Sequence, residues 1–406
     1  MRILFLSPHP PTPIKRRTLN LLRHLARRHE VHLRVLASPS ELRSAAVTES
    51  MDLLGAACAS VQVLPVSLSL RLAAAARDYT SGSDARSAYM HAHDRWAAPL
   101  QRECDQLDIE IVHADRVRLA RLAIRVDRPA LVDLPDCMSW GMDEWAAAAR
   151  GPRAAVYRSE ARRLRALEGG ALNSIPVITV ASPDDGERVR AAGYRGTPFY
   201  LPGIIDFLEE PARSPPPGAD ELHLMFHGTL SYRPNVDAIT AFVRDVLPEL
   251  RARHPGLVLS VVGARPVAAV RALRRSGVRV VADVPQIAPW LRAATAVVVP
   301  MRIAVGHSQK VCEALLARRP VICSAQAAAR VDADVRAALL VADGPDDWVR
   351  HVGGLIDDPA RAAALAEMGC EAVRRCYGPD AVVSRLENAY HAALEAWPDE
   401  NHPGER

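Results

Sequence analysis

The sequence predicts an α/β protein made of two doubly wound, Rossmann-like domains. Three observations predict this fold class. Short apolar runs alternate with stretches of helical periodicity, the runs are apolar at consecutive positions, and the alternation stops near residue 203 and restarts near residue 222. Runs that are apolar on both faces are typical of parallel strands covered by helices on both sides. A chain of 406 residues is long enough for two such domains.

The first half begins with a strand, helix, strand unit. RILFLS (2–7) and EVHLRVLAS (30–38) are apolar runs, and the stretch between them is predicted to be a helix. Its apolar positions are Leu19, Leu22, Leu25 and Ala26. Further strands are predicted at 109–114, 129–134, 176–181 and 198–202. The stretch 72–96 has no clear strand signal and is predicted to be either helical or mobile.

The chain changes character at GIIDFLEEPARSPPPGADE (203–221), which is rich in proline and acidic residues and is predicted to be an interdomain linker. Six more strands follow, at 222–228, 257–263, 278–284, 295–300, 320–324 and 338–344. The helices predicted between and after them are 234–253, 266–276, 285–294, 308–319, 345–357, 359–375 and 379–396.

The last predicted helix has an apolar stripe through Val382, Leu386, Tyr390 and Leu394. Such a stripe needs a surface to cover, and we expect the helix to cross back to the first domain. The predicted domains are therefore 1–203, 204–378 and a C-terminal helix in 379–406 that packs on the first.

Composition excludes several classes of protein. The 51 basic and 47 acidic residues are spread along the chain and give a net charge of +4, which is typical of a mixed, solvated surface and disfavours nucleic acid as a partner. Seven cysteines without a C-x-x-C pair disfavour a zinc site and a disulfide framework. The start of the chain has no signal-peptide pattern and no run is long enough to span a membrane, so the expected location is the cytoplasm.

Candidate binding residues follow two strands of the second half. In open parallel sheets, ligands bind beyond the carboxyl ends of the strands. The segment FHGTLSYRPNVDA places Gly228 directly after a strand and Arg233 just before a helix that begins with Pro234. The segment MRIAVGHSQKVCEAL places Gly306 after another strand and Lys310 in the first turn of the next helix.

Lys310 is notable because Lys15 is the only other lysine in the chain. A positive side chain in a first turn opposes the helix dipole, whereas a phosphate held between Lys310 and the helix amides would be stabilised. Glu313, three residues on, could accept hydrogen bonds from a ribose diol while Arg233 and Lys310 neutralise a diphosphate. Each residue alone also fits a solvated helix position or an ordinary turn. Together they predict a nucleotide diphosphate pocket.

These segments carry a resemblance to a known family. FHGTLSYRPNVDA, VVGARP and the stretch from VADVPQ to PVICS resemble the donor-binding half of glycosyltransferase family 4, which has the GT-B fold. The closest resemblance is to bacterial sugar transferases associated with exopolysaccharide and PEP-CTERM systems. SPHPPTPIKRRTLNLLRHLARRHEVHL and LVDLPDCMSW resemble the same branch. The likeness covers most of the chain and is strongest from 222 to 330.

The resemblance implies a retaining transfer from a nucleotide diphosphate sugar in a central cleft that the two domains face, with no required metal and no other cofactor. The donor-binding residues that it implies are Gly228, Arg233, Gly306, His307, Lys310 and Glu313. The catalytic residues that we predict are Arg233, Lys310 and His113. The chain departs from the family at two places: Val305 stands where many members have a second glutamate, and PPTPIK replaces a glycine-rich turn.

Retaining transfer leaves negative charge on the departing phosphate, so preorganised cations are the main catalytic device. The leaving phosphate can take the acceptor proton, and the paired carboxylates of glycosidases are then not needed. No compelling pair is found in the sequence.

The first domain is expected to hold the acceptor. His113 follows a strand, and DLPDCMS places Asp133, Asp136 and Ser139 after another. His113 could equally be a satisfied histidine at a strand end, and Asp136 a helix cap. The predicted acceptor-binding residues are Lys15, Arg17, Asp136 and Ser139.

Lys15, Arg16 and Arg17 could meet an anionic acceptor, such as a lipid diphosphate, or be a solvated helix start. The basic amphipathic run 15–29 could also rest on the inner face of an anionic membrane.

Three functions remain open from the sequence. The first is a retaining glycosyltransferase of polysaccharide or glycoconjugate biosynthesis, with a saccharide, lipid-linked or small-molecule acceptor. The second, a nucleotide-sugar epimerase of the same fold, needs acid and base carboxylates around the sugar, and Val305 makes it less attractive. The third is a non-catalytic nucleotide-sugar-binding homologue, against which the pair Lys310 and Glu313 argues.

Overall fold

The computed structural model describes the chain except residues 13–15, 81–89, 207–221, 285, 305 and 399–406. Its contacts divide the chain into two compact units. Unit 1 comprises Met1–Ile204 and Pro379–Arg406, and unit 2 comprises Ile205–Gly378. The sequence-based boundaries are 1–203, 204–378 and 379–406, and most of the predicted linker lies outside the described residues.

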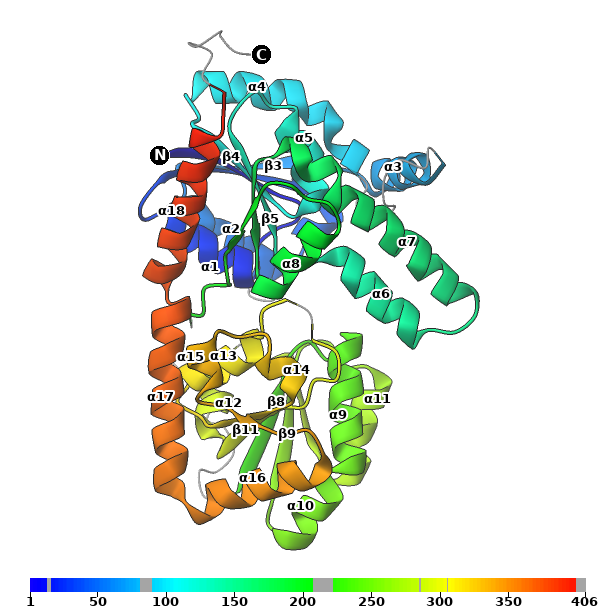
Figure 1. The fold of residues 1–406 in the computed structure, drawn as a ribbon, viewed down its shortest axis with the longest axis vertical. Coiled ribbons are helices and arrows are strands. Elements are labelled where there is room, and N and C mark those ends of the chain that lie inside the picture. The colour runs from blue at the N-terminus through cyan, green and yellow to red at the C-terminus, as the bar shows by residue number, and fades with distance from the viewer. Residues whose placement is uncertain (13–15, 81–89, 207–221, 285, 305, 399–406) are drawn as a thin grey trace. The chain divides into compact units, whose positions relative to one another are not determined.

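Unit 1 is built on a seven-stranded, all-parallel sheet in the order β3-β2-β1-β4-β5-β6-β7. Its strands are β1 (Arg2–Ser7), β2 (Glu30–Ala37), β3 (Ser60–Pro65), β4 (Ile111–Asp115), β5 (Ala130–Leu134), β6 (Val177–Val180) and β7 (Thr197–Tyr200). Helices cover both faces of this sheet (Figure 1). The prediction of a doubly wound, Rossmann-like domain is confirmed.

The strands of unit 1 form because both of their faces are buried. Leu4 and Leu6 belong to one apolar cluster, whereas Ile3 and Phe5, which alternate with them, belong to the cluster on the opposite face. Consecutive residues of a strand point to opposite faces, so a continuous apolar run is the pattern that such a sheet requires.

The sequence analysis missed β3 (Ser60–Pro65). This strand lies at the edge of the sheet, and only Leu64 among its residues is buried. An edge strand with one solvated face has no continuous apolar run, and that run was the signal used to find the other strands.

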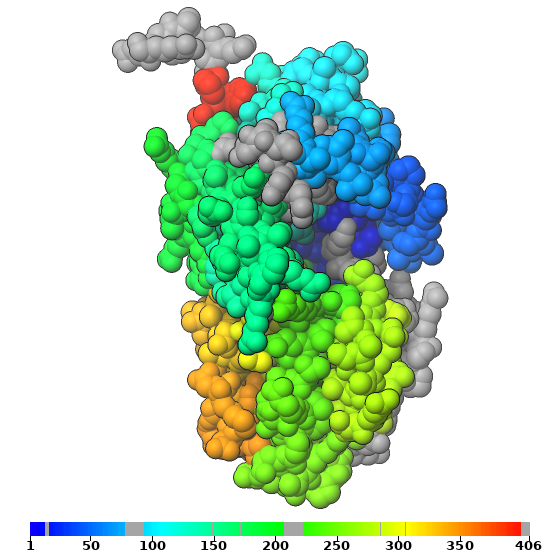
Figure 2. Space-filling view, turned by 90° about the vertical axis from the view of Figure 1, so that its right-hand side faces the viewer, coloured from blue at the N-terminus to red at the C-terminus, as the bar shows by residue number. Residues whose placement is uncertain are grey.

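The helices of unit 1 before the second unit are α1 (Arg16–Leu25), α2 (Ala45–Ala57), α3 (Leu68–Thr80), α4 (Ala97–Gln106), α5 (Ala120–Ile124), α6 (Met138–Ala148), α7 (Pro152–Gly169) and α8 (Pro183–Ala191). In Figure 1, α6 and α7 form a hairpin, and its atoms (teal) lie on the face turned toward the viewer in Figure 2. Leu19, Leu22 and Leu25 of α1 are buried in the core, so the apolar stripe of the run 15–29 is not available to a membrane.

The last helix, α18 (Pro379–Glu395), completes unit 1 from the far end of the chain (red in Figure 1). Val382, Leu386 and Tyr390 are buried in the same apolar cluster as Ile3 and Phe5. The predicted crossing of this helix back to the first domain is confirmed.

Unit 2 has a six-stranded parallel sheet in the order β10-β9-β8-β11-β12-β13. Its strands are β8 (His223–His227), β9 (Val258–Gly263), β10 (Arg279–Ala282), β11 (Ala296–Val299), β12 (Val321–Cys323) and β13 (Leu340–Val341). Its helices are α9 (Arg233–Asp245), α10 (Leu247–Arg253), α11 (Ala268–Ala272), α12 (Ala288–Ala293), α13 (Gln309–Leu316), α14 (Ala325–Ala328), α15 (Ala333–Arg336), α16 (Pro345–Asp357) and α17 (Pro359–Tyr377). The second Rossmann-like domain is therefore confirmed as well.

The single helix predicted at 234–253 is two helices, α9 and α10, with Val246 between them. Pro248 occupies the start of α10. A proline has no N–H to donate and clashes with the preceding turn, so it ends one helix and is tolerated in the first turn of the next.

Candidate functional site

The carboxyl edge of the unit 2 sheet brings together the loops that follow β8 and β11. These two strands are neighbours, and the strand order changes direction between them because β9 and β10 lie on one side and β12 and β13 on the other. Ligands of open parallel sheets bind at such a switch point.

Gly228 and Lys310 meet at this edge. They are far apart in the sequence, because Gly228 follows β8 whereas Lys310 lies in α13. Gly228 follows β8 with φ of +142°, and a Cβ placed there would lie 2.7 Å from Lys310 Cε and 3.4 Å from its Nζ. The same Cβ would lie 2.9 Å from Asn235 Nδ2. The Lys310 side chain thus lies beside the Gly228 backbone, whose positive φ favours a glycine.

Burial shifts the acid–base behaviour of Lys310. Enclosure of the ammonium lowers its pKa to about 8, and the carboxylate of Glu313 opposes this shift. Burial disfavours the charged form of an amine because the charge loses its hydration. An anion placed beside Lys310 would stabilise the charged form.

Glu313 lies one turn further along α13 and contacts a residue that the sequence analysis did not select. His227, the last residue of β8, is buried, and its Nδ1 lies 3.5 Å from Glu313 Oε2. Its Nε2 lies 3.3 Å from the backbone oxygen of Lys310. His227 therefore connects the end of β8 to the first turns of α13. Its place directly before Gly228 was the available signal.

The remaining predicted donor residues lie in the same loops. Gly306 precedes α13, is buried and has φ of +67°, a left-handed conformation that favours glycine. The His307 ring packs edge-on against Tyr377, with ring centroids 4.4 Å apart, and its Nε2 lies 3.6 Å from Cys312 Sγ. Arg233 is exposed at the first position of α9. Val305 lies outside the described residues.

In unit 1, His113 is not a strand-end residue as predicted but lies inside β4, fully buried. Its ring stacks on Phe5 with centroids 4.2 Å apart, and its Nδ1 lies 2.8 Å from Tyr390 Oη. Burial lowers its pKa to about 4, so the imidazole is neutral. The enclosure between Phe5 and α18 favours the alternative of a core histidine, and the catalytic role of His113 stays a prediction.

Arg17 is also placed differently from the prediction. It forms an ion pair with the buried Asp133, and its Nη2 donates to Asp133 Oδ1 at 3.0 Å and to the Leu201 carbonyl at 2.9 Å. Thr179 Oγ1 donates to the same Oδ1 at 2.7 Å. Burial tends to raise the pKa of Asp133, but Arg17 more than reverses this and lowers it. The Arg17 guanidinium is thus engaged within the protein.

The other predicted acceptor-binding residues differ in their surroundings. Asp136 is half-exposed, and its Oδ2 lies 3.5 Å from Arg116 Nη1. Ser139 is buried, and its backbone N–H donates to Glu168 Oε1 at 3.3 Å, so the start of α6 already holds a carboxylate of the protein itself. Lys15 lies outside the described residues.

Asp115 is a second residue that the sequence analysis missed. It is the last residue of β4 and lies beside Ser7, the last residue of β1, at the carboxyl edge of the unit 1 sheet. The predicted strand ended at residue 114, one position too early. A carboxylate that ends a buried apolar run was the available signal.

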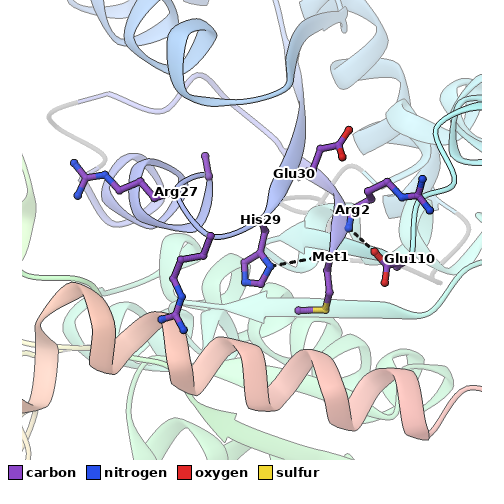
Figure 3. Close-up of a pocket in the computed structure, with 8 residues that line it drawn as sticks. Met1, Arg2, Arg27, His29, Glu30 and Glu110 are labelled. Carbon is purple, nitrogen blue, oxygen red and sulfur yellow. Dashed lines mark hydrogen bonds between the residues drawn. The ribbon is translucent and has the colours of Figure 1, made fainter.

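A hollow of about 500 Å³ lies at the opposite edge of this sheet (Figure 3). Met1, Arg27, His29, Glu30 and Glu110 line it, around the amino ends of β1, β2 and β4. Because ligands of parallel sheets bind at the carboxyl edge, this hollow is not part of the candidate site. Among the described residues, no cluster of metal-ligating side chains is found, and none of the described helices is long and apolar enough to cross a membrane.

The known proteins that this chain resembles are glycosyltransferases. Residues 221–358, which contain the site of unit 2, match the family described as Glycosyl transferases group 1. Two relatives from Catenulispora acidiphila are named D-inositol 3-phosphate glycosyltransferase 1 and 2. This chain is 35% identical to the first over 113 residues and 29% identical to the second over 211 residues. The matched segments cover 27% and 48% of this chain and the same shares of the relatives, so the similarity spans less than half of either relative.

Solved structures match over nearly the whole chain. Sucrose-phosphate synthase from Thermosynechococcus elongatus superposes with a TM-score of 0.66 at 15% identity, covering 98% of this chain and 100% of that one. The Anabaena protein HepE in complex with UDP superposes with a TM-score of 0.65 at 13% identity, covering 97% and 100%. At this identity the likeness shows the GT-B fold. The fold and the matched family together support a glycosyltransferase.

Proposed function

We propose that this protein is a retaining glycosyltransferase that moves a sugar from a nucleotide diphosphate sugar to an acceptor. The observation that carries the proposal is the contact of Lys310 with the Gly228 backbone at the switch point of unit 2. It places a cation beside a glycine backbone at this edge, near the start of α13. This is the combination that binds a diphosphate.

Lys310 would neutralise the charge that develops on the departing phosphate. The bond between the sugar anomeric carbon and the phosphate oxygen breaks, a bond from that carbon to the acceptor oxygen forms, and the acceptor proton passes to the phosphate on the same face. A cation preorganised at the phosphate stabilises this transition state without dedicated protein carboxylates. Arg233, at the start of α9, is the second cation in the proposal, and no metal is required by it.

Glu313 would accept hydrogen bonds from the ribose hydroxyl groups of the donor. Its contact with His227 supports this role, because a carboxylate held from one side presents its other oxygen in a fixed direction. Gly306 and His307 belong to the loop before α13 and complete the donor side of the proposal.

The structural neighbours suggest which donor to test first. HepE has been solved with UDP, with UDP and glucose, and with UDP-glucose. We therefore propose a UDP-sugar as the first candidate. The association with exopolysaccharide or PEP-CTERM systems, family 4, and a place in the cytoplasm or at the inner membrane face remain part of the proposal.

The test is hydrolysis and binding of UDP-, GDP- and dTDP-sugars by the wild type, Lys310→Ala and Glu313→Ala. We expect one nucleotide class to bind and to be hydrolysed slowly without acceptor, and about a hundredfold loss of hydrolysis in Lys310→Ala. Glu313→Ala should weaken binding of the nucleoside diphosphate by about tenfold or more. The matched control Glu371→Ala changes a surface carboxylate of α17 in the same unit.

The outcomes separate the three functions. Release of free nucleotide with transfer of the sugar supports the transferase. Interconversion of the sugar without loss of the nucleotide would identify an epimerase. Binding without any turnover in a full acceptor panel would identify a non-catalytic homologue, and absence of binding at millimolar concentration would refute the proposal.

A further inference from the structure

The carboxyl edge of the unit 1 sheet holds a buried polar cluster at its own switch point. β1 and β4 are neighbours in the sheet, and the strand order runs away from them in opposite directions. Ser7 ends β1 and Asp115 ends β4, so both polar side chains lie where an open parallel sheet binds its ligand.

Asp115 is 1% exposed, and its two oxygens differ. Oδ2 accepts hydrogen bonds from Thr18 Oγ1 at 3.0 Å and from Ser7 Oγ at 3.4 Å. Oδ1 has no hydrogen-bond partner in the part of the chain that the structure describes. Buried carboxylate oxygens nearly always have a partner, because an unpartnered one loses its hydration without compensation. Oδ1 is therefore a buried acceptor that no described group of the protein uses.

The backbone next to Asp115 is held in an unfavourable conformation. Arg116 has φ of +77°, and its N–H donates to the Asp133 carbonyl at 2.8 Å. Non-glycine residues rarely adopt positive φ, and such strain persists mainly at functional sites. The Arg116 side chain reaches the half-exposed Asp136, with 3.5 Å between Nη1 and Oδ2, so the cluster leads from the buried carboxylate to the surface.

The charges of this cluster favour a neutral ligand over a phosphate. Asp115 and Asp133 are both buried carboxylates, and Arg17, the cation predicted to meet an anionic acceptor, is paired with Asp133. A free carboxylate oxygen accepts a hydrogen bond from a hydroxyl group but repels phosphate oxygens. Burial raises the pKa of Asp115, and the nearby Asp133 acts in the same direction, whereas Arg116 and Arg17 oppose them.

We infer that Asp115 Oδ1 accepts a hydrogen bond from a hydroxyl group of the sugar acceptor, and that this acceptor is a neutral polyhydroxylated compound, a sugar or a cyclitol. The inference rests on the proposed function. Asp115 is a binding residue in it, because the proton of the reacting hydroxyl group still passes to the departing phosphate. Oδ1 is enclosed, so binding requires a local rearrangement around Ser7, whose Oγ donates to the His9 carbonyl at 2.8 Å.

The experiment measures transfer from the donor found in the panel above to neutral pyranoses and myo-inositol, and to their monophosphates, with the full chain. Variants are Asp115→Asn, which keeps the shape but presents an amide, Thr18→Val, which removes one donor to Oδ2, and the control Asp52→Asn on exposed α2. We expect wild type and the control to use at least one neutral acceptor. For that acceptor, kcat/KM should fall about tenfold or more in Asp115→Asn and less in Thr18→Val.

Titration with UDP separates this inference from the proposed function: the proposed UDP contacts all come from unit 2, so the Kd for UDP should stay within about twofold of wild type in Asp115→Asn. Three results would overturn the inference while leaving the proposed function intact: transfer to phosphorylated acceptors alone, no transfer to any neutral hydroxyl compound, or an unchanged kcat/KM in Asp115→Asn. If Asp115→Asn does not fold, an unchanged kcat/KM in Thr18→Val overturns it instead. Loss of donor binding in wild type would refute the proposed function itself.

Discussion

At the scale of single residues, the candidate site depends on ionisable groups held where water is scarce. Lys310 is the clearest case, because enclosure lowers its pKa to about 8. Desolvation disfavours the charged form of Lys310 and the Glu313 carboxylate offsets only part of this cost, so a diphosphate would be bound partly through relief of the remainder. The same residue is therefore a pH-dependent component of donor binding.

We predict that UDP binds more weakly as the pH rises through about 8. In the complex, the diphosphate raises the pKa of Lys310, so the bound form holds its proton where the free form loses it. Affinity is then complete below this pKa and falls above it, by up to about tenfold per pH unit. Calorimetric titration from pH 7.5 to 9.5 measures this.

Lys310→Gln serves as the reference, because it keeps the titration of the nucleotide but lacks the ammonium. We expect it to bind UDP weakly and with little dependence on pH in this range. A pH profile as steep as that of wild type would mean that another group titrates.

The residues that the sequence analysis placed wrongly share a physical cause. His113 was expected at a ligand because polar residues at strand ends usually face one, but Tyr390, 277 positions away, covers it and accepts or donates its hydrogen bond. His227 and Asp115 were overlooked because they end apolar runs and were counted with the strands. In each case a contact distant in sequence decides the role of the side chain.

At the scale of elements, the sequence predicted the two loops that follow β8 and β11. The contact between these loops follows from the order of the strands in the sheet. Gly228 and Lys310 come together because β8 and β11 are adjacent, which the alternation of strands and helices implies. The edge strand β3 and the break between α9 and α10 were not predicted. The first lacks a continuous apolar run, and the second depends on one proline inside a long amphipathic pattern.

We predict that Gly228→Ala weakens binding of UDP by about tenfold or more and lowers the melting temperature. A side chain at φ of +142° is strained, and its Cβ would displace Lys310 Cε, which would lie at 2.7 Å. Titration with UDP and thermal unfolding are the two measurements.

Gly256→Ala is the matched control for this change. It lies in the same unit, before β9, and a Cβ there meets no atom within 4 Å. We expect near wild-type binding and melting from it. Equal binding of UDP by both variants would show that the contact between Gly228 and Lys310 is not needed for the nucleotide.

At the scale of the whole molecule, unit 1 is made of two distant pieces of chain, whereas unit 2 is continuous. The helix α18 supplies Val382, Leu386 and Tyr390 to the core of unit 1. The two ends of unit 2 lie side by side, because the backbone N–H of Ile205 donates to the carbonyl of Tyr377 at 3.0 Å.

We predict that Tyr390→Phe lowers the free energy of unfolding by about 1 kcal/mol, because it leaves Nδ1 of the buried His113 without its partner. Urea unfolding measures the loss. Tyr157→Phe in α7 removes a hydroxyl group from a half-buried side chain and should change stability little. Equal stability of the two variants would show that the contact contributes nothing.

The return of α18 has a consequence for how the protein is made on the ribosome. Every residue of unit 2 is synthesised before Pro379, so the nascent chain can complete the later half while the earlier half still exposes the groove that α18 covers. The core of the unit that is begun first is thus completed by a segment that is made after the whole of the other unit. Until α18 has been synthesised, the apolar residues around Phe5 lack the helix that covers them.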